Sequence, residues 1–247
     1  MSYTIAIAGK GGVGKTTTSS LLIKLLAKIA TPVLAVDADP NSNLNTLLGL
    51  DYTETIADIR EEAKNLNSLN MSKSDFFNMK IEEAISEGKG IDLLVMGRPE
   101  GSGCYCAVNN ILREYLSKIS KSYRFVVIDN EAGMEHLSRR TASNIDQLVL
   151  VSDPTAVGLR SAVNAYNTVK KAGIKVEEFS LIINKAKEKI DSKKEKIIEE
   201  AGLVIDGYLP YQEQIVETSE KGNIMEVDND IGDLPRLIEK IVKKVRA

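Results

Sequence analysis

The sequence has no stretch that approaches the roughly 18 uninterrupted apolar residues of a membrane-spanning helix, so we expect no transmembrane helix. Its first ten residues, MSYTIAIAGK, lack the basic start and the long apolar core of a signal peptide. Only two cysteines are present among 247 residues, too few for a disulfide framework. Together these absences predict a protein of the reducing cytoplasm.

An excess of positive charge is also missing. The chain has 32 Lys and Arg residues against 35 Asp and Glu residues, a net charge of −3. Proteins that bind nucleic acid broadly usually carry a basic excess, so we expect no nucleic acid among the partners. The 43% of hydrophobic and 27% of charged residues are ordinary for a soluble globular protein that buries a substantial core.

Short runs rich in aliphatic residues alternate along the chain with stretches of helical spacing. Most of the runs are continuously apolar, as in strands buried on both faces. The alternation predicts an α/β fold, with a mostly parallel twisted sheet of about seven strands and helices on both faces. Because it continues to the end, we expect one domain, residues 1–247, with a charged and mainly helical elaboration at about 51–90. The predicted strands are 3–9, 32–38, 91–97, 124–130, 147–153, 179–185 and 203–209, and the clearest helices are 16–29, 108–120, 157–172 and 192–201.

A glycine-rich loop, GKGGVGKTT at residues 9–17, stands between the first predicted strand and a helix. It contains the P-loop pattern G-x-x-x-x-G-K-[ST]. The glycines let backbone N–H groups face phosphates, and the helix adds the positive end of its dipole. Lys15 is expected to reach the β- and γ-phosphates, and the Thr16 hydroxyl to ligate Mg²⁺. The predicted nucleotide-binding residues of the loop are Gly11, Gly12, Val13, Gly14, Lys15, Thr16 and Thr17.

Lys10 is an addition to the ordinary pattern, because a P-loop does not require a lysine after its first glycine. With it, KGGVGKTT resembles the deviant P-loop of the class that contains the nitrogenase iron protein, MinD and ParA. The resemblance implies that Lys10 is a catalytic residue that reaches across a homodimer to the partner's nucleotide. It therefore implies an ATP-dependent homodimer.

Acidic residues follow two further predicted strands, at the edge of a parallel sheet where ligands collect. In VDADPNSNL the resemblance implies that Asp39 orients the attacking water, and Asp37 lies towards the magnesium ion as a weaker candidate ligand. In VVIDNEAGMEHL, Asp129 matches the Walker-B position, and Gly133 matches the glycine whose N–H senses the γ-phosphate. The switch departs from the D-x-P-x-G pattern frequent in relatives, because Glu131 replaces the proline.

The predicted base pocket has weaker markers. By resemblance, Asn184 in the segment INK is expected on the adenine, and Pro210 in LPY belongs to the backbone that flanks the base. An asparagine at a strand end is also a common turn residue. An aspartate that would complete an N-K-x-D pattern is missing, which disfavours GTP. We expect ATP hydrolysis rather than transfer, because no substrate-binding domain is evident.

The two cysteines stand one residue apart in GSGCYCAVNN, before a helix that we expect to begin around Ala107. Cys104 and Cys106 are compatible with a redox pair, half of a metal site, or two unrelated small residues. A disulfide across one residue would be strained, and two thiolates alone do not supply the four ligands of a zinc site. In the homodimer implied by the resemblance, two copies of C-x-C on a two-fold axis would give a Cys₄ site.

The C-x-C pair together with EAGMEHLSRRTA is similar to the CooC/AcsF-type accessory ATPases, which insert nickel into carbon monoxide dehydrogenase and acetyl-CoA synthase. The resemblance implies an intersubunit Ni²⁺ or Zn²⁺ site at Cys104 and Cys106, with ATP and Mg²⁺ as cofactors and an apo nickel enzyme as partner. Thiolates bind both metals, so nickel follows from family likeness alone. For the sole histidine, His136, we favour a solvent-facing or helix-end role over that of a ligand.

Two alternatives remain open. A MinD/ParA-like positioning ATPase would use the basic amphipathic C-terminal segment DLPRLIEKIVKKVRA at a membrane, although a closing helix packed on the sheet is the more economical interpretation and a membrane partner is not favoured. An iron–sulfur electron donor of the nitrogenase iron-protein type needs a second cluster cysteine in the switch DNEAGMEHL, which has none. Colour and iron content of the anaerobic protein would distinguish this donor from a metal chaperone.

Overall fold

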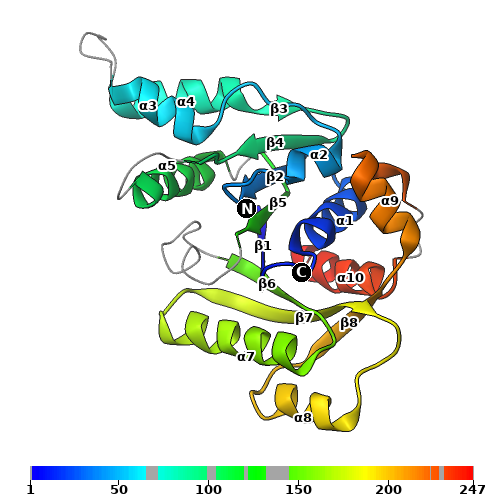
Figure 1. The fold of residues 1–247 in the computed structure, drawn as a ribbon. Coiled ribbons are helices and arrows are strands. Elements are labelled where there is room, and N and C mark those ends of the chain that lie inside the picture. The colour runs from blue at the N-terminus through cyan, green and yellow to red at the C-terminus, as the bar shows by residue number, and fades with distance from the viewer. Residues whose placement is uncertain are drawn as a thin grey trace.

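The computed structural model describes residues 2–64, 72–98, 104–119, 122–131, 145–222, 224–227 and 231–246. Its centre is an eight-stranded sheet in the order β3-β4-β2-β5-β1-β6-β7-β8, with helices on both faces (Figure 1). Seven strands are parallel, and the eighth, β3, is a two-residue antiparallel edge strand. The predicted α/β class is confirmed. The strands are β1 (Tyr3–Gly9), β2 (Val33–Ala38), β3 (Ser86–Glu87), β4 (Ile91–Val95), β5 (Phe125–Asn130), β6 (Ile145–Ser152), β7 (Val176–Ala186) and β8 (Ile205–Pro210).

The helices follow the strands as expected of right-handed crossovers between parallel strands. Two predicted boundaries are off by three residues, because α5 begins at Cys104 rather than around Ala107 and β7 begins at Val176 rather than at 179. The last glycine before α5 is Gly103, and the residues of the helix that follow it contain no glycine or proline that would disfavour a helix. The helices are α1 (Lys15–Ala27), α2 (Leu44–Leu48), α3 (Ile56–Lys64), α4 (Lys73–Ala84), α5 (Cys104–Ile119), α7 (Ala156–Lys171), α8 (Ser192–Glu199), α9 (Glu213–Lys221), α10 (Leu234–Arg246) and the short 3₁₀ helix η1 (Ile224–Glu226).

Each central strand is buried on both faces, which explains its continuous apolar run. Along β5, the odd-numbered Phe125 and Val127 pack with α1 and α10, whereas the even-numbered Val126 and Ile128 pack with α3, α4 and α5. On that second face, a further cluster joins β1, β6 and β7 to α7 and α8. The period-two alternation of β5 therefore assigns each of its side chains to one of two helical layers.

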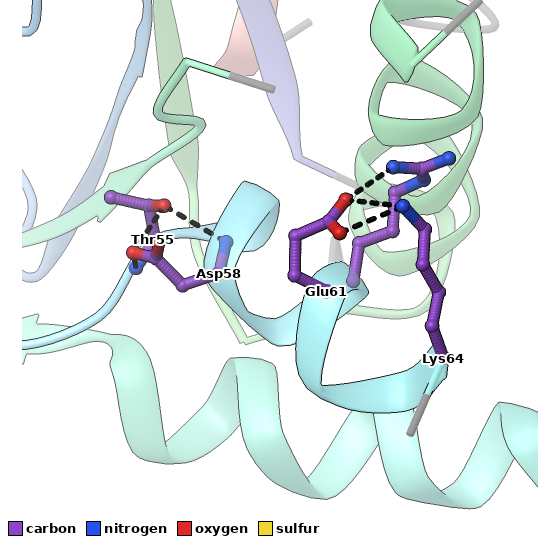
Figure 2. A network of polar contacts seen from close by, with 5 residues as sticks. Thr55, Asp58, Glu61 and Lys64 are labelled. Carbon is purple, nitrogen blue, oxygen red and sulfur yellow. Dashed lines mark hydrogen bonds and ion pairs between the residues drawn. The ribbon is translucent and has the colours of Figure 1, made fainter. Parts of the chain in front are cut away.

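Within residues 51–90, α3 and α4 lie side by side beyond α5, away from the centre of the sheet (Figure 1). Figure 2 shows the polar contacts at α3: Thr55 donates from N and Oγ1 to Asp58 Oδ2, and Asp58 N donates back to Thr55 Oγ1 at 3.2 Å. This reciprocal cap fixes the start of the helix. The backbone N–H of Ala57 also donates to the carbonyl of Met96 at 3.0 Å, and a Cβ on Gly97 would lie 2.5 Å from Thr55 Cβ. The start of α3 thus packs against Met96 and Gly97, directly after β4.

The C-terminal helix α10 is strongly amphipathic, but its apolar face lies in the protein core. Leu237, Ile238 and Ile241 are at most 3% exposed, and they pack in the same cluster as α1. This packing agrees with the closing-helix interpretation and leaves these side chains unavailable to a lipid surface. Among the described residues, no helix has the length and apolarity needed to cross a membrane.

Candidate functional site

The loop between β1 and α1 has the backbone conformation that a phosphate cradle requires. Gly12 and Gly14 have positive φ angles of 79° and 90°, in the left-handed region that favours glycine. A Cβ at Gly14 would lie 2.3 Å from Asn184 Nδ2, so space as well as conformation demands glycine there. Val13, between them, is buried at 1% exposure. The sequence pattern is therefore realised as a closely held loop at the carboxyl edge of the sheet.

The two lysines of the loop, Lys10 and Lys15, are in contact at the start of α1. Lys15 is buried, and its Nζ donates to the carbonyl oxygen of Lys10 at 3.5 Å. Thr18 secures the first turn, because its Oγ1 donates to the Gly14 carbonyl at 2.8 Å. The side chain of Lys10 is exposed, so its structural contribution to the loop is made by the main chain.

The end of β7 is bonded to the same loop, which sequence reasoning did not foresee. Asn184 Nδ2 donates to the carbonyl of Val13 at 2.7 Å, and Lys185 Nζ donates to the carbonyl of Gly12 at 2.9 Å. Lys185 has a φ of 58°, unusual for a residue other than glycine. Asn184 Oδ1 accepts from the N–H of Lys185 at 2.8 Å and so supports this turn. Asn184 therefore holds the P-loop whether or not it also meets a base.

Two buried carboxylates converge below the loop, at adjacent strand ends. Asp129 of β5 is 1% exposed and its Oδ1 accepts from Ser19 Oγ of α1 at 2.8 Å. Its Oδ2 has no hydrogen-bond partner within the described part of the chain. Asp37 of β2 stands directly beside it in register. The Thr16 hydroxyl is close enough to Asp129 to lower the pKa of that carboxyl group, so the predicted Walker-B residue and the predicted magnesium ligand lie near each other.

Asp37 organises the loop that follows β2. Its Oδ1 accepts from the N–H of Asp39 at 3.1 Å and its Oδ2 from the N–H of Leu44 at 3.0 Å, which ties the strand end to the start of α2. Asp39 Oδ1 in turn accepts from the N–H of Asn41 at 2.9 Å. Because both oxygens of Asp37 are engaged by backbone, this residue positions Asp39 as well as lying near Asp129.

The electrostatics of the two buried acids favour a cation. Burial and, as the second cause, the neighbouring Asp129 carboxylate together raise the pKa of Asp37 to about 7. Burial raises the pKa of Asp129 to about 6, against the lowering effect of the hydrogen bonds from Thr16 and Ser19. A divalent cation would relieve this repulsion and restore both carboxylates to their ionised form.

Two adjoining cavities open on this constellation. One of about 530 Å³ is lined by the P-loop, by Asp39 with the α2 segment, and by Glu131 from the end of β5. The other, of about 330 Å³, is lined by Asn184, Lys185 and Pro210 together with the exposed Tyr211. Gly14 and Thr17 border both cavities, so a ligand with a charged and an apolar end can lie across the loop.

The predicted metal-site cysteines lie in the first turn of α5, which follows β4 and therefore starts from the same edge of the sheet as the P-loop. Their side chains lie outside the described part of the structure, as do Gly133 and His136 altogether. Within the described residues, no group of three or more His, Cys, Asp or Glu side chains is arranged to hold a metal ion.

A P-loop on β1 and α1, an aspartate at the predicted Walker-B position on β5 and an aspartate loop after β2 are the features of a P-loop ATPase of the α/β class. The model of the AAA domain family matches residues 2–179, and the chain belongs to this family. An uncharacterized ATP-binding protein of Methanocaldococcus jannaschii is 43% identical over 249 residues, covering 97% of this chain and 98% of that protein. The carbon monoxide dehydrogenase accessory protein CooC of Rhodospirillum rubrum is 34% identical over 185 residues, covering 69% of this chain and 70% of that protein.

Solved structures share the fold. The septum site-determining protein MinD of Pyrococcus horikoshii, complexed with Mg-ADP, superposes with a TM-score of 0.69 at 22% identity and covers 99% of both chains. At this identity the likeness concerns the fold alone. The chain is therefore a MinD/ParA-like P-loop ATPase in architecture and a homologue of CooC in sequence.

Proposed function

We propose that the protein hydrolyses ATP as a homodimer and binds a metal ion, nickel in the cell, through Cys104 and Cys106 of both subunits for insertion into carbon monoxide dehydrogenase or acetyl-CoA synthase. The observation that carries the proposal is the C-x-C pair in the first turn of α5, in a chain that is 34% identical to CooC. A helix N-terminus favours thiolates, the form in which cysteine binds metal.

The phosphate cavity fits a magnesium nucleotide. The unpartnered Oδ2 of Asp129 and the nearby Thr16 hydroxyl are the oxygen donors that would hold Mg²⁺, directly or through water. Bound there, Mg²⁺ would neutralise charge on the phosphates. The fit is supported by Gly14, where a Cβ would collide with Asn184 Nδ2 and so displace the side chain that holds the loop.

The chain's own residues then divide the work of hydrolysis. Backbone N–H groups from Gly11 to Thr17 bind the phosphate oxygens, and Lys15 extends from the base of the same cavity. Asp39 is held at the cavity wall by its bonds to the loop after β2, where it orients water for attack on the γ-phosphate. Lys10 is exposed, as a residue that contacts a partner's nucleotide must be.

The metal is the cargo of this cycle rather than a resident cofactor. In the proposal, ATP binding joins two subunits and brings both C-x-C pairs together as a Cys₄ site, and hydrolysis loosens the interface. The chain leaves β4 close to the nucleotide edge, because the N–H of Met96 donates to the carbonyl of Asp37 at 2.8 Å. The end of β4 is therefore bonded to the strand that bears the aspartate loop.

The decisive experiment is anaerobic titration of the full-length protein with Ni²⁺ and, separately, with Zn²⁺, with and without Mg-ATP, while oligomer size is followed by light scattering. We expect about one metal ion per dimer and tighter binding with ATP. The Cys104→Ser/Cys106→Ser variant should bind no metal but still bind ATP. The Lys15→Ala variant should still bind metal through its cysteines, but ATP should no longer tighten that binding. Metal binding at full stoichiometry in the double serine variant would exclude the cysteine site.

A positioning ATPase of the MinD/ParA type is supported by the fold, but the buried apolar face of α10 leaves that helix without the surface a membrane anchor needs.

A further inference from the structure

Two asparagines are fully buried at the interface of β5 and α5. Asn109, in the second turn of α5, is 0% exposed, and neither its Nδ2 nor its Oδ1 has a hydrogen-bond partner in the described ranges. Asn130, the last residue of β5, is also 0% exposed. Its Nδ2 donates to the carbonyls of Ile7 at 2.9 Å and Ile128 at 3.3 Å, while its Oδ1 has no partner there. Buried amides without partners are unfavourable, so packing alone does not account for them.

Asn130 links the nucleotide edge to the layer that holds α5. It follows Asp129 directly, and the alternation of β5 puts the two side chains on opposite faces of the sheet. Asp129 faces α1, where it accepts from Ser19. Asn130 shares its face with the residues of β5 that pack in one cluster with α5, namely Val126 and Ile128 against Val108 and Leu112. Any shift of the end of β5 upon nucleotide binding therefore reaches this cluster through Asn130.

Asn109 belongs to α5, next to Val108 of this cluster and three residues after Cys106. Residues at i and i+3 are neighbours on a helix, and helical side chains lean towards the N-terminal turn. Asn109 therefore neighbours the turn of α5 that contains Cys106. Its neighbour Asn110 is exposed and provides a matched position for comparison.

The unpartnered atoms are complementary: Asn109 Nδ2 is a donor and Asn130 Oδ1 is an acceptor. We propose that Asn109 and Asn130 are positioning residues: these two atoms, which are not bonded to each other in this structure, form a hydrogen bond when nucleotide binds at Asp129, and this bond conveys nucleotide binding to the cysteine-bearing first turn of α5. The metal-binding role of that turn rests on the function proposed above. The link between Asn109 and Asn130 depends only on how β5 and α5 pack.

The link is testable without metal, because Cys104 and Cys106 are the only thiols in the chain. The rate of alkylation by iodoacetamide, read by mass spectrometry of the full-length metal-free protein, reports on this turn alone. We expect saturating Mg-ATP to change the rate about tenfold, within the usual range of coupling between sites. In Asn109→Leu the change should fall below about twofold at unaltered ATP affinity, while Asn110→Leu should behave as the wild type.

Stability separates positioning from a structural role. Replacing an unsatisfied amide by an apolar side chain of similar shape is nearly neutral or stabilising, so Asn109→Leu should unfold at the same temperature as the wild type or higher. Asn109→Thr and Asn109→Val form a second pair of equal shape, of which only the threonine variant should retain the nucleotide effect. Asn109→Leu/Asn130→Leu should lose no more of the effect than either single variant, because both act through one bond.

The outcomes also separate this inference from the proposed function. Full retention of the nucleotide effect in Asn109→Leu, or in both the threonine and valine variants, would overturn the inference. An unchanged alkylation rate in the wild type with ATP would overturn it as well, even if metal binds at the cysteines. Conversely, loss of the effect in Asn109→Leu in a protein that binds no Ni²⁺ or Zn²⁺ would support the link and refute the metal site.

Discussion

Gly14→Ala should damage the P-loop more than Gly12→Ala, although both glycines have left-handed backbone conformations. At Gly12 an added Cβ meets nothing within 4 Å, whereas at Gly14 it would lie 2.3 Å from Asn184 Nδ2. Both variants bear the conformational strain, but only Gly14→Ala must displace the asparagine. That displacement breaks the 2.7 Å hydrogen bond from Asn184 to the carbonyl of Val13.

The difference can be estimated from these contacts. A left-handed conformation costs an alanine about 1–2 kcal/mol, which applies to both variants. Loss of the Asn184–Val13 hydrogen bond adds about 0.5–1.5 kcal/mol at Gly14 alone. We therefore expect unfolding free energies lower by about 1–2 kcal/mol for Gly12→Ala and about 1.5–3.5 kcal/mol for Gly14→Ala. Effects of the new methyl group on the unfolded chain are shared and cancel in the comparison.

Urea unfolding of the two variants and of Asn184→Ala measures these terms, and a fluorescent ATP analogue reports on the loop. In the double variant Gly14→Ala/Asn184→Ala the colliding amide is gone, so its loss of stability should be smaller than the sum of the two single losses. Equal losses for Gly12→Ala and Gly14→Ala, or strict additivity in the double variant, would refute the assignment of Asn184 as the partner that holds the loop.

Three further perturbations test other parts of the site. With EDTA present, the free energy of unfolding should fall as pH rises from about 4 to about 7. The pKa values of Asp37, near 7, and Asp129, near 6, are raised in the folded state, which therefore binds more protons than the unfolded state in this pH range. Thermal unfolding measured across this range should show the decrease, and Mg-ATP should make it smaller. Lys185→Gly relieves a positive φ of 58° but removes the hydrogen bond from Lys185 to the Gly12 carbonyl. Calorimetry should therefore show ATP binding weakened several-fold without loss of stability. Unchanged ATP binding would mean that the hydrogen bond is dispensable. Lys10→Ala keeps the main-chain carbonyl that accepts a hydrogen bond from Lys15 Nζ. Fluorescence titration should therefore show that the monomer still binds ATP, while light scattering should show no ATP-dependent dimer. A normal ATP-dependent dimer would contradict a role of Lys10 across the interface.

The strands were predictable because their residues are buried on both faces, and continuous apolar runs have few other causes in a soluble chain. The β1 run at residues 3–9 coincides with the strand, and the P-loop pattern places Lys15 at the first position of α1. The start of α5 was misplaced because amphipathic spacing becomes visible only from Val108 onwards, whereas the helix itself requires no apolar face in its first turn. Local patterns thus locate elements better than they locate helix ends.

Contacts between distant segments had no sequence signal of this kind. Asn184 and Val13 are 171 residues apart, and only the parallel order of β1, β6 and β7 brings their ends together. Lys185 was visible as part of an N-K dipeptide, but its bond to Gly12 depends on a left-handed turn that lysine rarely adopts. Asn109 offered a clearer hint, because an amide stands within the apolar stripe formed by Val108, Leu112 and Tyr115. A polar residue in such a stripe is the signal that single-sequence reasoning can seek.

The strand β5 brings the two halves of the proposed function within one residue of each other. Its odd-numbered face presents Asp129 to α1 and the phosphate loop, and its even-numbered face presents Asn130 to the layer beneath α5. Because a strand is stiff across a single peptide unit, Asp129 cannot shift along the strand axis without moving Asn130. In the proposed link, a nucleotide that draws on Asp129 would act on the cysteine-bearing helix through the sheet itself, and the two sites would need no separate moving domain to communicate.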